Sequence, residues 1–126
     1  MLYIPMPKVR VIFFADRSGC PVLKWLDDIP KKAYAKALVR IERLAELGHE
    51  LRRPEADFLR DGIYELRWRF QSVNYRILYF YHGREVVVLS SGLTKETAVP
   101  SDEISLALRR KRTYEADPDK HTHEEE

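Results

Sequence analysis

Three β-rich runs joined by short linkers constrain this chain more than any other feature of its sequence. The runs are Ile63–Phe70, Tyr75–His82 and Glu85–Ser91, and only residues 71–74 and 83–84 separate them. Aromatic and β-branched residues, which favour strands, are frequent in all three runs. Linkers this short join antiparallel neighbours, because parallel strands need a long crossover. The sequence therefore predicts a three-stranded antiparallel meander.

The first half of the chain predicts one strand and two helices. Residues 8–14 (KVRVIFF) alternate as a strand does. Pro21 suits the first position of a helix, because its missing N–H would be unpaired there anyway, and Pro30 separates that helix from a longer one. The longer helix ends at Gly48, a residue suited to a left-handed cap. Its single apolar face consists of Tyr34, Ala37, Leu38, Ile41, Leu44 and Ala45. We therefore expect a helical hairpin, followed by a loop over residues 49–57.

A last helix follows the meander. Pro100 stops extended structure, Ser101 is a suitable N-cap, and the acidic pair Asp102 and Glu103 is favourable against the helix dipole. This order predicts an α+β fold: a small antiparallel β-sheet with the N-terminal helical hairpin and the C-terminal helix packed on one of its faces. One domain spans residues 1–114, and the acidic tail 115–126 has no periodicity and is predicted to be mobile.

The charge is distributed unevenly between these two parts. Residues 1–114 hold 21 Lys/Arg and 14 Asp/Glu, a net charge of +7, whereas residues 115–126 hold one Lys and six acids, a net charge of −5. A basic body attracts polyanions, of which nucleic acids are the commonest, although basic residues can also serve solubility alone. If RNA is the partner, the acidic tail could shield a basic groove while RNA is absent.

Several classes of protein are excluded or disfavoured. No apolar run approaches the roughly 18 residues of a membrane span, and the first residues lack the pattern of a signal peptide. The single cysteine, Cys20, cannot form an internal disulfide, which fits a cytoplasmic protein with no membrane partner. A Gly-rich phosphate loop, zinc-ligand spacing and a Ser-His-Asp pattern are all missing. We expect neither a metal nor a cofactor, and His121 and His123 read as part of a mobile tail.

Two strands of the meander carry the candidate site. Along the first, Glu65, Arg67 and Arg69 share one face because side chains alternate across a strand. Arginine offers a rigid fork of donors that matches phosphate oxygens, although a solvated face with Glu–Arg pairs would look the same. On the second strand, Arg76 is the lone charge in an apolar run. It must either pair with Glu65 or point into a cleft, since an unpaired arginine is rarely buried.

Further basic residues follow these strands. Lys95 sits where the chain leaves the sheet, a position that often carries function, but taken alone it reads as an ordinary surface lysine. Arg109 and Arg110 suit the C-terminal end of the last helix and could also extend an RNA-binding surface.

Taken together, these features resemble the RelE/HigB superfamily of toxin–antitoxin toxins, particularly its phage-derived HigB-like branch. The resemblance covers roughly Val9 to Tyr114, and its pieces occur in the family's order. The pieces are Trp25-Leu26, Ile29-Pro30, Leu47-Gly48, Asp61-Gly62-Ile63-Tyr64-Glu65-Leu66-Arg67, Tyr75-Arg76-Ile77-Leu78-Tyr79-Phe80, Leu93-Thr94-Lys95-Glu96-Thr97, Pro100, Glu103-Ile104 and Ala107-Leu108-Arg109-Arg110.

The resemblance implies an mRNA interferase that acts in the ribosomal A site and is neutralised by a helix-turn-helix antitoxin. Such toxins use no metal and cleave RNA by attack of the 2′-hydroxyl on the adjacent phosphodiester. Carried over by motif, Arg67 and Arg76 would clamp the phosphate, and Lys95 would stabilise the transition state or assist proton transfer. Glu65 would accept a proton or orient its neighbours, with Arg69, Arg109 and Arg110 contacting RNA.

Two positions depart from the family pattern. Glu96 replaces the second lysine of a Lys-Lys-Thr motif, and Ser101-Asp102 occupies the region where some relatives carry a tyrosine. The general base is therefore unassigned. Two alternatives to the ribonuclease remain: a ParE-like toxin that inhibits DNA gyrase, and an inactivated relative that only binds an antitoxin or RNA.

Overall fold

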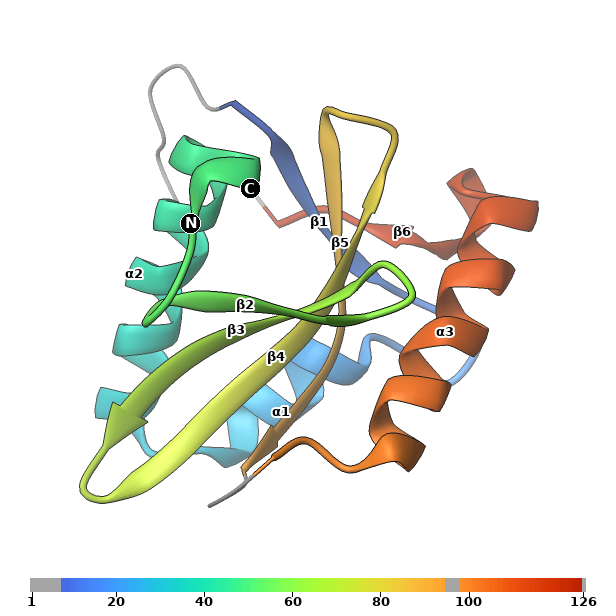
Figure 1. The fold of residues 1–126 in the computed structure, drawn as a ribbon. Helices are drawn as coiled ribbons and strands as arrows, with labels where there is room; N and C mark the ends of the chain where they lie inside the picture. Colours follow the sequence, from blue (N-terminus) through green and yellow to red (C-terminus); the bar gives the residue numbers. More distant parts are fainter. Residues whose placement is uncertain (1–7, 95–97, 126) are drawn as a thin grey trace.

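A computed structural model describes residues 8–94 and 98–125, and its elements form one six-stranded sheet with helices on both faces (Figure 1). In chain order these elements are β1 (Arg10–Phe14), α1 (Pro21–Asp28), α2 (Lys31–Leu47), η1 (Gly48–Glu50), β2 (Ala56–Arg60), β3 (Ile63–Phe70), β4 (Val73–His82), β5 (Val86–Thr94), α3 (Ser101–Ala116), η2 (Asp119–His121) and β6 (Thr122–His123). The predicted α+β class is confirmed.

The sheet is antiparallel except at one pair of strands. Its order is β2-β3-β4-β5-β1-β6, and the predicted meander occupies β3, β4 and β5. β1 pairs in parallel with β5, from Arg10 opposite Val86 to Phe13 opposite Leu89. The remaining pairs, including β1 with β6, are antiparallel. The sheet is therefore mixed but mostly antiparallel.

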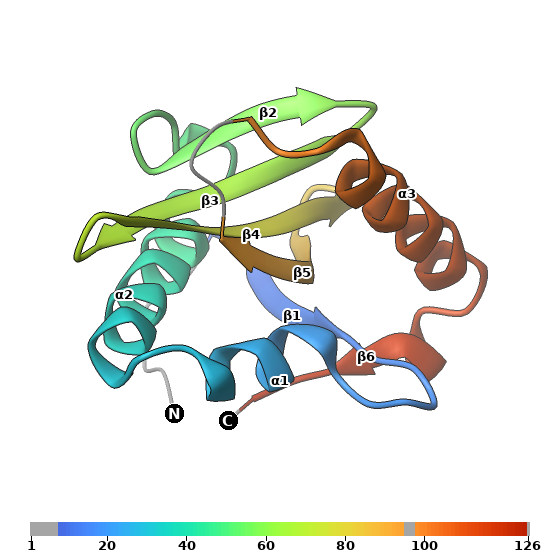
Figure 2. The same ribbon diagram turned by 90° about the horizontal axis from the view of Figure 1, so that it is seen from below.

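The helices do not share one face, which corrects the sequence-based expectation. Figure 2 shows α1 and α2 on one side of the sheet and α3 on the other. The reason lies in β4, whose side chains are buried in both directions. Tyr75, Ile77 and Tyr79 enter the core under α1 and α2, and Leu78 and Phe80 enter a second core under α3. A strand that is apolar on both faces requires cover on both faces.

A two-residue turn sets the register of the β3–β4 hairpin. Phe70 pairs with Val73, so only Gln71 and Ser72 form the turn. Both have positive φ, 48° and 66°, which is the backbone geometry of the hairpin turn that matches strand twist. This register places Arg67 directly opposite Arg76.

The sequence-based expectation missed β2. Residues 49–57 were expected to form a loop, but the edge strand β2 begins at Ala56 and pairs with β3, with Ala56 opposite Leu66 and Phe58 opposite Tyr64. Edge strands lie half in solvent, and β2 (ADFLR) carries three apolar side chains among charged ones. Its signal is therefore weak, and pairing with β3 creates the strand.

The acidic tail contains the end of α3 and a short strand of the sheet. α3 continues to Ala116, and β6 then pairs with β1 at the edge of the sheet opposite β2. The His121 ring stacks on Phe14 at 5.5 Å and 3°, and its Nδ1 lies 2.9 Å from the Ala15 carbonyl oxygen. Arg10 donates two hydrogen bonds of 2.8 Å to Glu124. The tail therefore covers backbone that would otherwise form an open strand edge.

Candidate functional site

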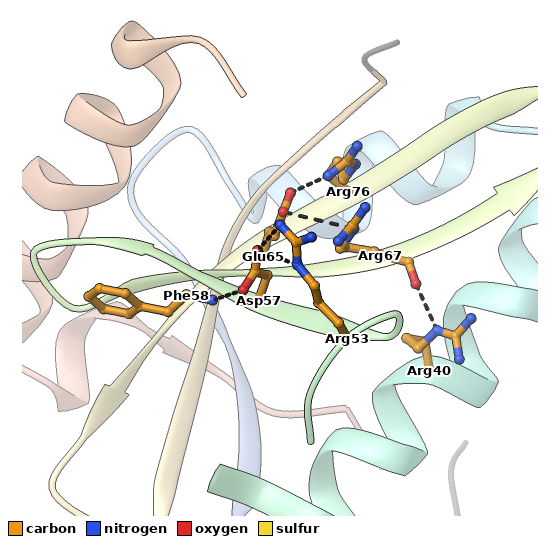
Figure 3. Close-up of polar contacts among 7 residues, drawn as sticks. All are labelled: Arg40, Arg53, Asp57, Phe58, Glu65, Arg67 and Arg76. Carbon is orange, nitrogen blue, oxygen red and sulfur yellow. Dashed lines mark hydrogen bonds and ion pairs between the residues drawn. The ribbon is translucent and has the colours of Figure 1, made fainter. Parts of the chain in front are cut away.

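One part of the sheet face under α3 carries charge instead of apolar side chains. Ile63 and Leu78 lie in the core beneath α3. Because side chains alternate, Glu65 and Arg67 on β3 and Arg76 on β4 share that face with them. Figure 3 shows these three side chains gathered on neighbouring strands. The predicted pair of arginines is therefore brought together by the hairpin.

Glu65 lies between the two arginines and is almost fully buried, with 4% of its surface exposed. It accepts a hydrogen bond from Arg76 Nη1, and its Oε2 lies 3.8 Å from Arg67 Nε. Like charges directly opposite each other destabilise a sheet, so the shared carboxylate is what makes the Arg67–Arg76 pairing tolerable. Arg76 thus both pairs with Glu65 and reaches a cleft, the two options that its sequence context left open.

Two hollows of about 220 and 380 Å³ meet at Arg67 and Arg76, which line both of them. The smaller is also lined by Arg40, Pro54, Trp68, Arg69 and Asn74. The larger is also lined by Arg53, Asp57, Leu59, Arg60, Glu65, Ala98, Val99 and Ile104. We call the two hollows together the arginine groove. Their shared boundary is where an anion can meet both guanidinium groups.

Arg53 and Asp57 add an ion pair to the rim of the arginine groove. The Arg53 Nη2 lies 2.7 Å from Asp57 Oδ2, and Asp57 Oδ1 also accepts a 3.0 Å hydrogen bond from the Phe58 backbone N–H. The hydrogen bond from Arg53 holds the pKa of Asp57 below its usual range. Sequence reasoning missed both residues because it placed them in a loop. An Arg and an Asp at i and i+4 that flank a strand start would have been the available signal.

α2 fixes the backbone of Arg67 from the other side. β2 begins at Ala56 opposite Leu66, so the β3 backbone beyond Leu66 has no strand partner at this edge. Instead Arg67 N–H donates to the Glu55 carbonyl at 2.8 Å. Arg40 Nε donates to the Arg67 carbonyl at 2.8 Å (Figure 3). Both backbone polar groups of Arg67 are thus held, as partly buried backbone requires.

The Glu55 carboxylate completes this support. It accepts hydrogen bonds from Arg40 Nη1 at 2.6 Å and, in bidentate fashion, from Arg43 at 2.9 Å. The hydrogen bond from Arg43 is the main cause that lowers the pKa of Glu55. Bidentate guanidinium–carboxylate pairs are strong and directional. Arg40 is therefore a positioning residue whose Nε and Nη1 are already engaged.

The other predicted site residues have different locations. Arg69 is exposed beside the smaller hollow, and no carboxylate of the described residues pairs with it. Arg109 is exposed on α3 and lines neither hollow. Lys95, with Glu96, lies outside the described residues.

Arg110 is half-buried away from the arginine groove. Its Nη1 donates to the Ser90 carbonyl at 2.7 Å and lies 3.2 Å from Ser91 Oγ, and its guanidinium lies 5.6 Å from the centre of the Phe14 ring. Burial lowers the pKa of Arg110. These contacts give it a structural role beneath α3.

Metal and membrane features can be stated for the described part of the chain. Within residues 8–94 and 98–125, no group of three or more His, Cys, Asp and Glu side chains is arranged to hold a metal ion. Within the same residues, the helices are too short or too polar to cross a membrane. Burial raises the pKa of the Cys20 thiol, which opposes formation of a reactive thiolate.

Fold and site together define a class: a small α+β protein that presents clustered arginines on the open part of its sheet. The family model of the phage-derived protein Gp49-like group (DUF891) matches residues 24–112. The chain belongs to this Gp49-like family. It is also similar to the "Probable endoribonuclease HigB1" of two Mycobacterium tuberculosis strains, CDC 1551 / Oshkosh and ATCC 25618 / H37Rv. In each case 30% of 103 aligned residues are identical, and the alignment covers 81% of either chain. The predicted resemblance to HigB-like proteins is confirmed.

Proposed function

We propose that this protein is the toxin of a toxin–antitoxin pair and that it cleaves mRNA in the arginine groove. The observation that carries the proposal is the Arg67–Arg76 pair, opposed in register around the buried Glu65. Glu65 compensates one of these two charges, and one positive charge remains for a ligand. A phosphodiester that bridges the two guanidinium groups would make the arrangement favourable. The similarity to a probable endoribonuclease supports the same reaction.

In the proposed reaction the 2′-oxygen of a ribose attacks the adjacent phosphorus. The bond from phosphorus to the 5′-oxygen of the next nucleotide breaks, which leaves a 2′,3′-cyclic phosphate and a 5′-hydroxyl. One proton leaves the attacking hydroxyl, and one is taken up by the departing oxygen. No metal is needed for this balance. Negative charge builds up on the non-bridging oxygens, where fixed cations stabilise the transition state most.

Each residue of the arginine groove has its own role in the proposed cleavage. Arg67 and Arg76 clamp the phosphate, and Glu65 is a positioning residue because its carboxylate already holds Arg76. Asp57 is the more exposed carboxylate of the groove, with 28% of its side chain accessible against 5% for Glu65. Its ion pair with Arg53 and its lowered pKa nevertheless disfavour Asp57 as acceptor of the 2′-hydroxyl proton, so the general base stays unassigned. Lys95 is proposed, from the motif, to stabilise the same transition state.

The natural substrate proposed is mRNA in the ribosomal A site, and the proposed partner is a helix-turn-helix antitoxin. Both follow from the superfamily that the chain resembles. Addition of purified protein to a translation extract, with cleavage sites mapped by primer extension, tests the reaction. Purified mRNA without ribosomes tests the ribosome dependence. We expect cuts in translated mRNA and none in the ribosome-free sample.

The decisive variant is Arg76→Lys, with Arg84→Lys as its control. Lysine keeps a cation beside the buried Glu65, which protects the fold, but it loses the bidentate fork. Arg84 is exposed in the turn between β4 and β5. We expect Arg76→Lys to lower cleavage at least 10-fold and Arg84→Lys to leave it unchanged. Equal cleavage by both variants, or no cleavage by the wild type, contradicts the proposal. Inhibition of gyrase supercoiling without RNA cleavage would favour the ParE-like alternative.

A substitution at Glu96 tests the remaining alternative, that the protein is an inactivated relative that only binds an antitoxin or RNA. If Glu96→Lys cleaves mRNA and the wild type does not, the natural protein only binds. If the wild type cleaves, Glu96 is compatible with activity. The same translation extract serves for both proteins.

A further inference from the structure

The two halves of the arginine groove differ in chemical character. Arg67 and Arg76 are common to both halves. The smaller hollow adds Arg40 and Arg69 to them, and no Asp or Glu is among its lining residues in the described chain. The larger hollow adds two ion-paired arginines, two carboxylates and an apolar wall. The larger hollow thus differs from the smaller one by its carboxylates and by the aliphatic side chains on its wall.

The apolar wall of the larger hollow comes from two elements that are distant in sequence. Leu59 projects from β2, and Val99 and Ile104 lie just before and within the first turns of α3. Leu59 and Val99 are only half-buried, although both pack against the core under α3. Partly exposed apolar side chains beside charged groups are typical of ligand sites, where a few polar groups fix orientation. The volume of about 380 Å³ lies within the common range for such sites, roughly 300 to 1,000 Å³.

The charged groups of the smaller hollow differ in their partners. Arg40 shares the Glu55 carboxylate with Arg43 and donates to the Arg67 carbonyl, so part of its charge is compensated. Arg69 is exposed, and Asn74 lies directly across the hairpin from it. An exposed guanidinium with an amide beside it offers several donors to phosphate oxygens.

We propose that the groove has a defined polarity toward RNA. A nucleobase next to the scissile phosphate packs against Leu59, Val99 and Ile104 in the larger hollow. A neighbouring backbone phosphate is bound by Arg69 in the smaller hollow. The inference rests on the proposed function, since it assumes that a phosphodiester lies at Arg67 and Arg76. It makes Leu59 a specificity-determining residue and Arg69 a residue for affinity without base preference.

The test uses RNA that cannot be cleaved. Short 2′-O-methyl oligonucleotides that carry either a full set of bases or one abasic position are titrated against the full chain, and Kd is measured at several salt concentrations. The abasic position is moved along the oligonucleotide one nucleotide at a time. For the wild type we expect one position at which loss of the base weakens binding about fivefold, since packing of the base on aliphatic side chains removes apolar surface from water.

Two variants measure separately what the larger and the smaller hollow contribute to RNA binding. We expect Leu59→Ala to abolish the difference between the intact and the abasic probe at that position. Arg69→Ala should weaken both probes equally and reduce the slope of log Kd against log salt by about one unit. Leu108→Ala is the control for Leu59, because Leu108 packs on the same core and lines neither hollow. It should leave the ratio of the two probes unchanged.

The results that overturn the inference differ from those that overturn the proposed function. If Leu59→Ala weakens both probes equally, or if Arg69→Ala changes their ratio, the polarity is wrong even when the wild type cleaves mRNA. If no abasic position matters in the wild type, the base subsite does not exist. If the wild type shows the expected probe ratios and never cleaves mRNA, the polarity holds and the proposed reaction fails.

Discussion

Two regions on the α3 side of the sheet each bury an arginine, and they use it differently. Beneath α3, Arg110 directs its donors at the Ser90 carbonyl and its flat face at Phe14. In the arginine groove, Arg67 and Arg76 share the single carboxylate of Glu65 and line open hollows. Burial alone therefore does not mark a functional arginine. What marks it is donor capacity that the fold leaves unused beside a space for a ligand.

Ser90 shows why Arg110 is needed for structure. Leu78 pairs with Ser91 and Tyr79 pairs with Leu89, so Ser90 is the extra residue of a bulge in β5. A bulge leaves backbone groups outside the regular ladder, and here the guanidinium supplies a donor for the orphaned carbonyl. Arg110 therefore completes the sheet, whereas among residues 8–94 and 98–125 the charged partner of the Arg67 side chain is Glu65, at 3.8 Å.

The largest effect that we expect comes from Arg67→Ala. Loss of one fixed donor at a developing negative charge lowers catalytic rates about 100-fold or more. The change should leave the fold intact, because Arg67 is held mainly through its backbone and its side chain is 28% exposed. Cleavage rates from primer extension, with thermal unfolding as a control, check this. Unchanged cleavage by a folded variant would break the distinction between the two regions.

Arg110→Met should give the reverse result. The methionine keeps apolar packing on Phe14 but removes the donor to the Ser90 carbonyl, at a cost of about 1–3 kcal/mol in the free energy of unfolding. Cleavage per folded molecule should not change. Urea unfolding together with the cleavage assay measures both quantities. A selective loss of cleavage at full stability would assign Arg110 to RNA after all.

A smaller effect concerns the support behind Arg67. Because the folded-state pKa of Glu55 is lowered by Arg43, the ionised carboxylate contributes stability at and above the pKa of the unfolded chain, near 4.3. That contribution is lost as pH falls through the lower folded-state pKa. We expect Glu55→Gln to be less stable than the wild type at pH 7 and to lose less stability on acidification. Parallel pH profiles of unfolding for the two proteins would refute this.

The smallest effect is expected from removing residues 117–126. The described part of this tail lies at the β1 edge, at the opposite end of the strand order from β2, and Glu124 already pairs with Arg10. The Debye length of about 8 Å at physiological salt screens charges at such separations. RNA affinity at that salt should therefore be unchanged, with only a modest loss of thermal stability. Tighter RNA binding after truncation would restore the shielding hypothesis that the charge pattern suggested.

Much of the fold could be predicted because local patterns carried it. Short linkers specified the meander, Pro21 and Pro30 divided the helical hairpin, and Gly48 ended the second helix with a φ of 55°. β2 and β6 could not be found in the same way. Each is an edge strand of few residues whose extended structure depends on a partner strand distant in sequence, β3 for β2 and β1 for β6.

The residues of the site can be separated in the same way, into those that local sequence predicts and those that depend on strand pairing. Alternation along β3 sufficed to place Glu65, Arg67 and Arg69 on one face, and the hairpin brought Arg76 beside them. The sequence could not predict Arg53, Asp57 and Leu59 as site residues, because they join the groove only through the pairing of β2 with β3. The role of Arg110 was hidden too, since its partner Ser90 belongs to a bulge that the sequence does not signal.

The sequence by itself thus determined which charged side chains share a strand face and which family the chain resembles, because both depend on residues close in sequence and on their order. Only the tertiary structure decided which arginines have their donors used by the fold. Whether a guanidinium meets a carbonyl, a carboxylate or an open hollow depends on contacts between distant segments. Arg110 and Arg76, alike as arginines in the sequence, are told apart by Ser90 and Glu65.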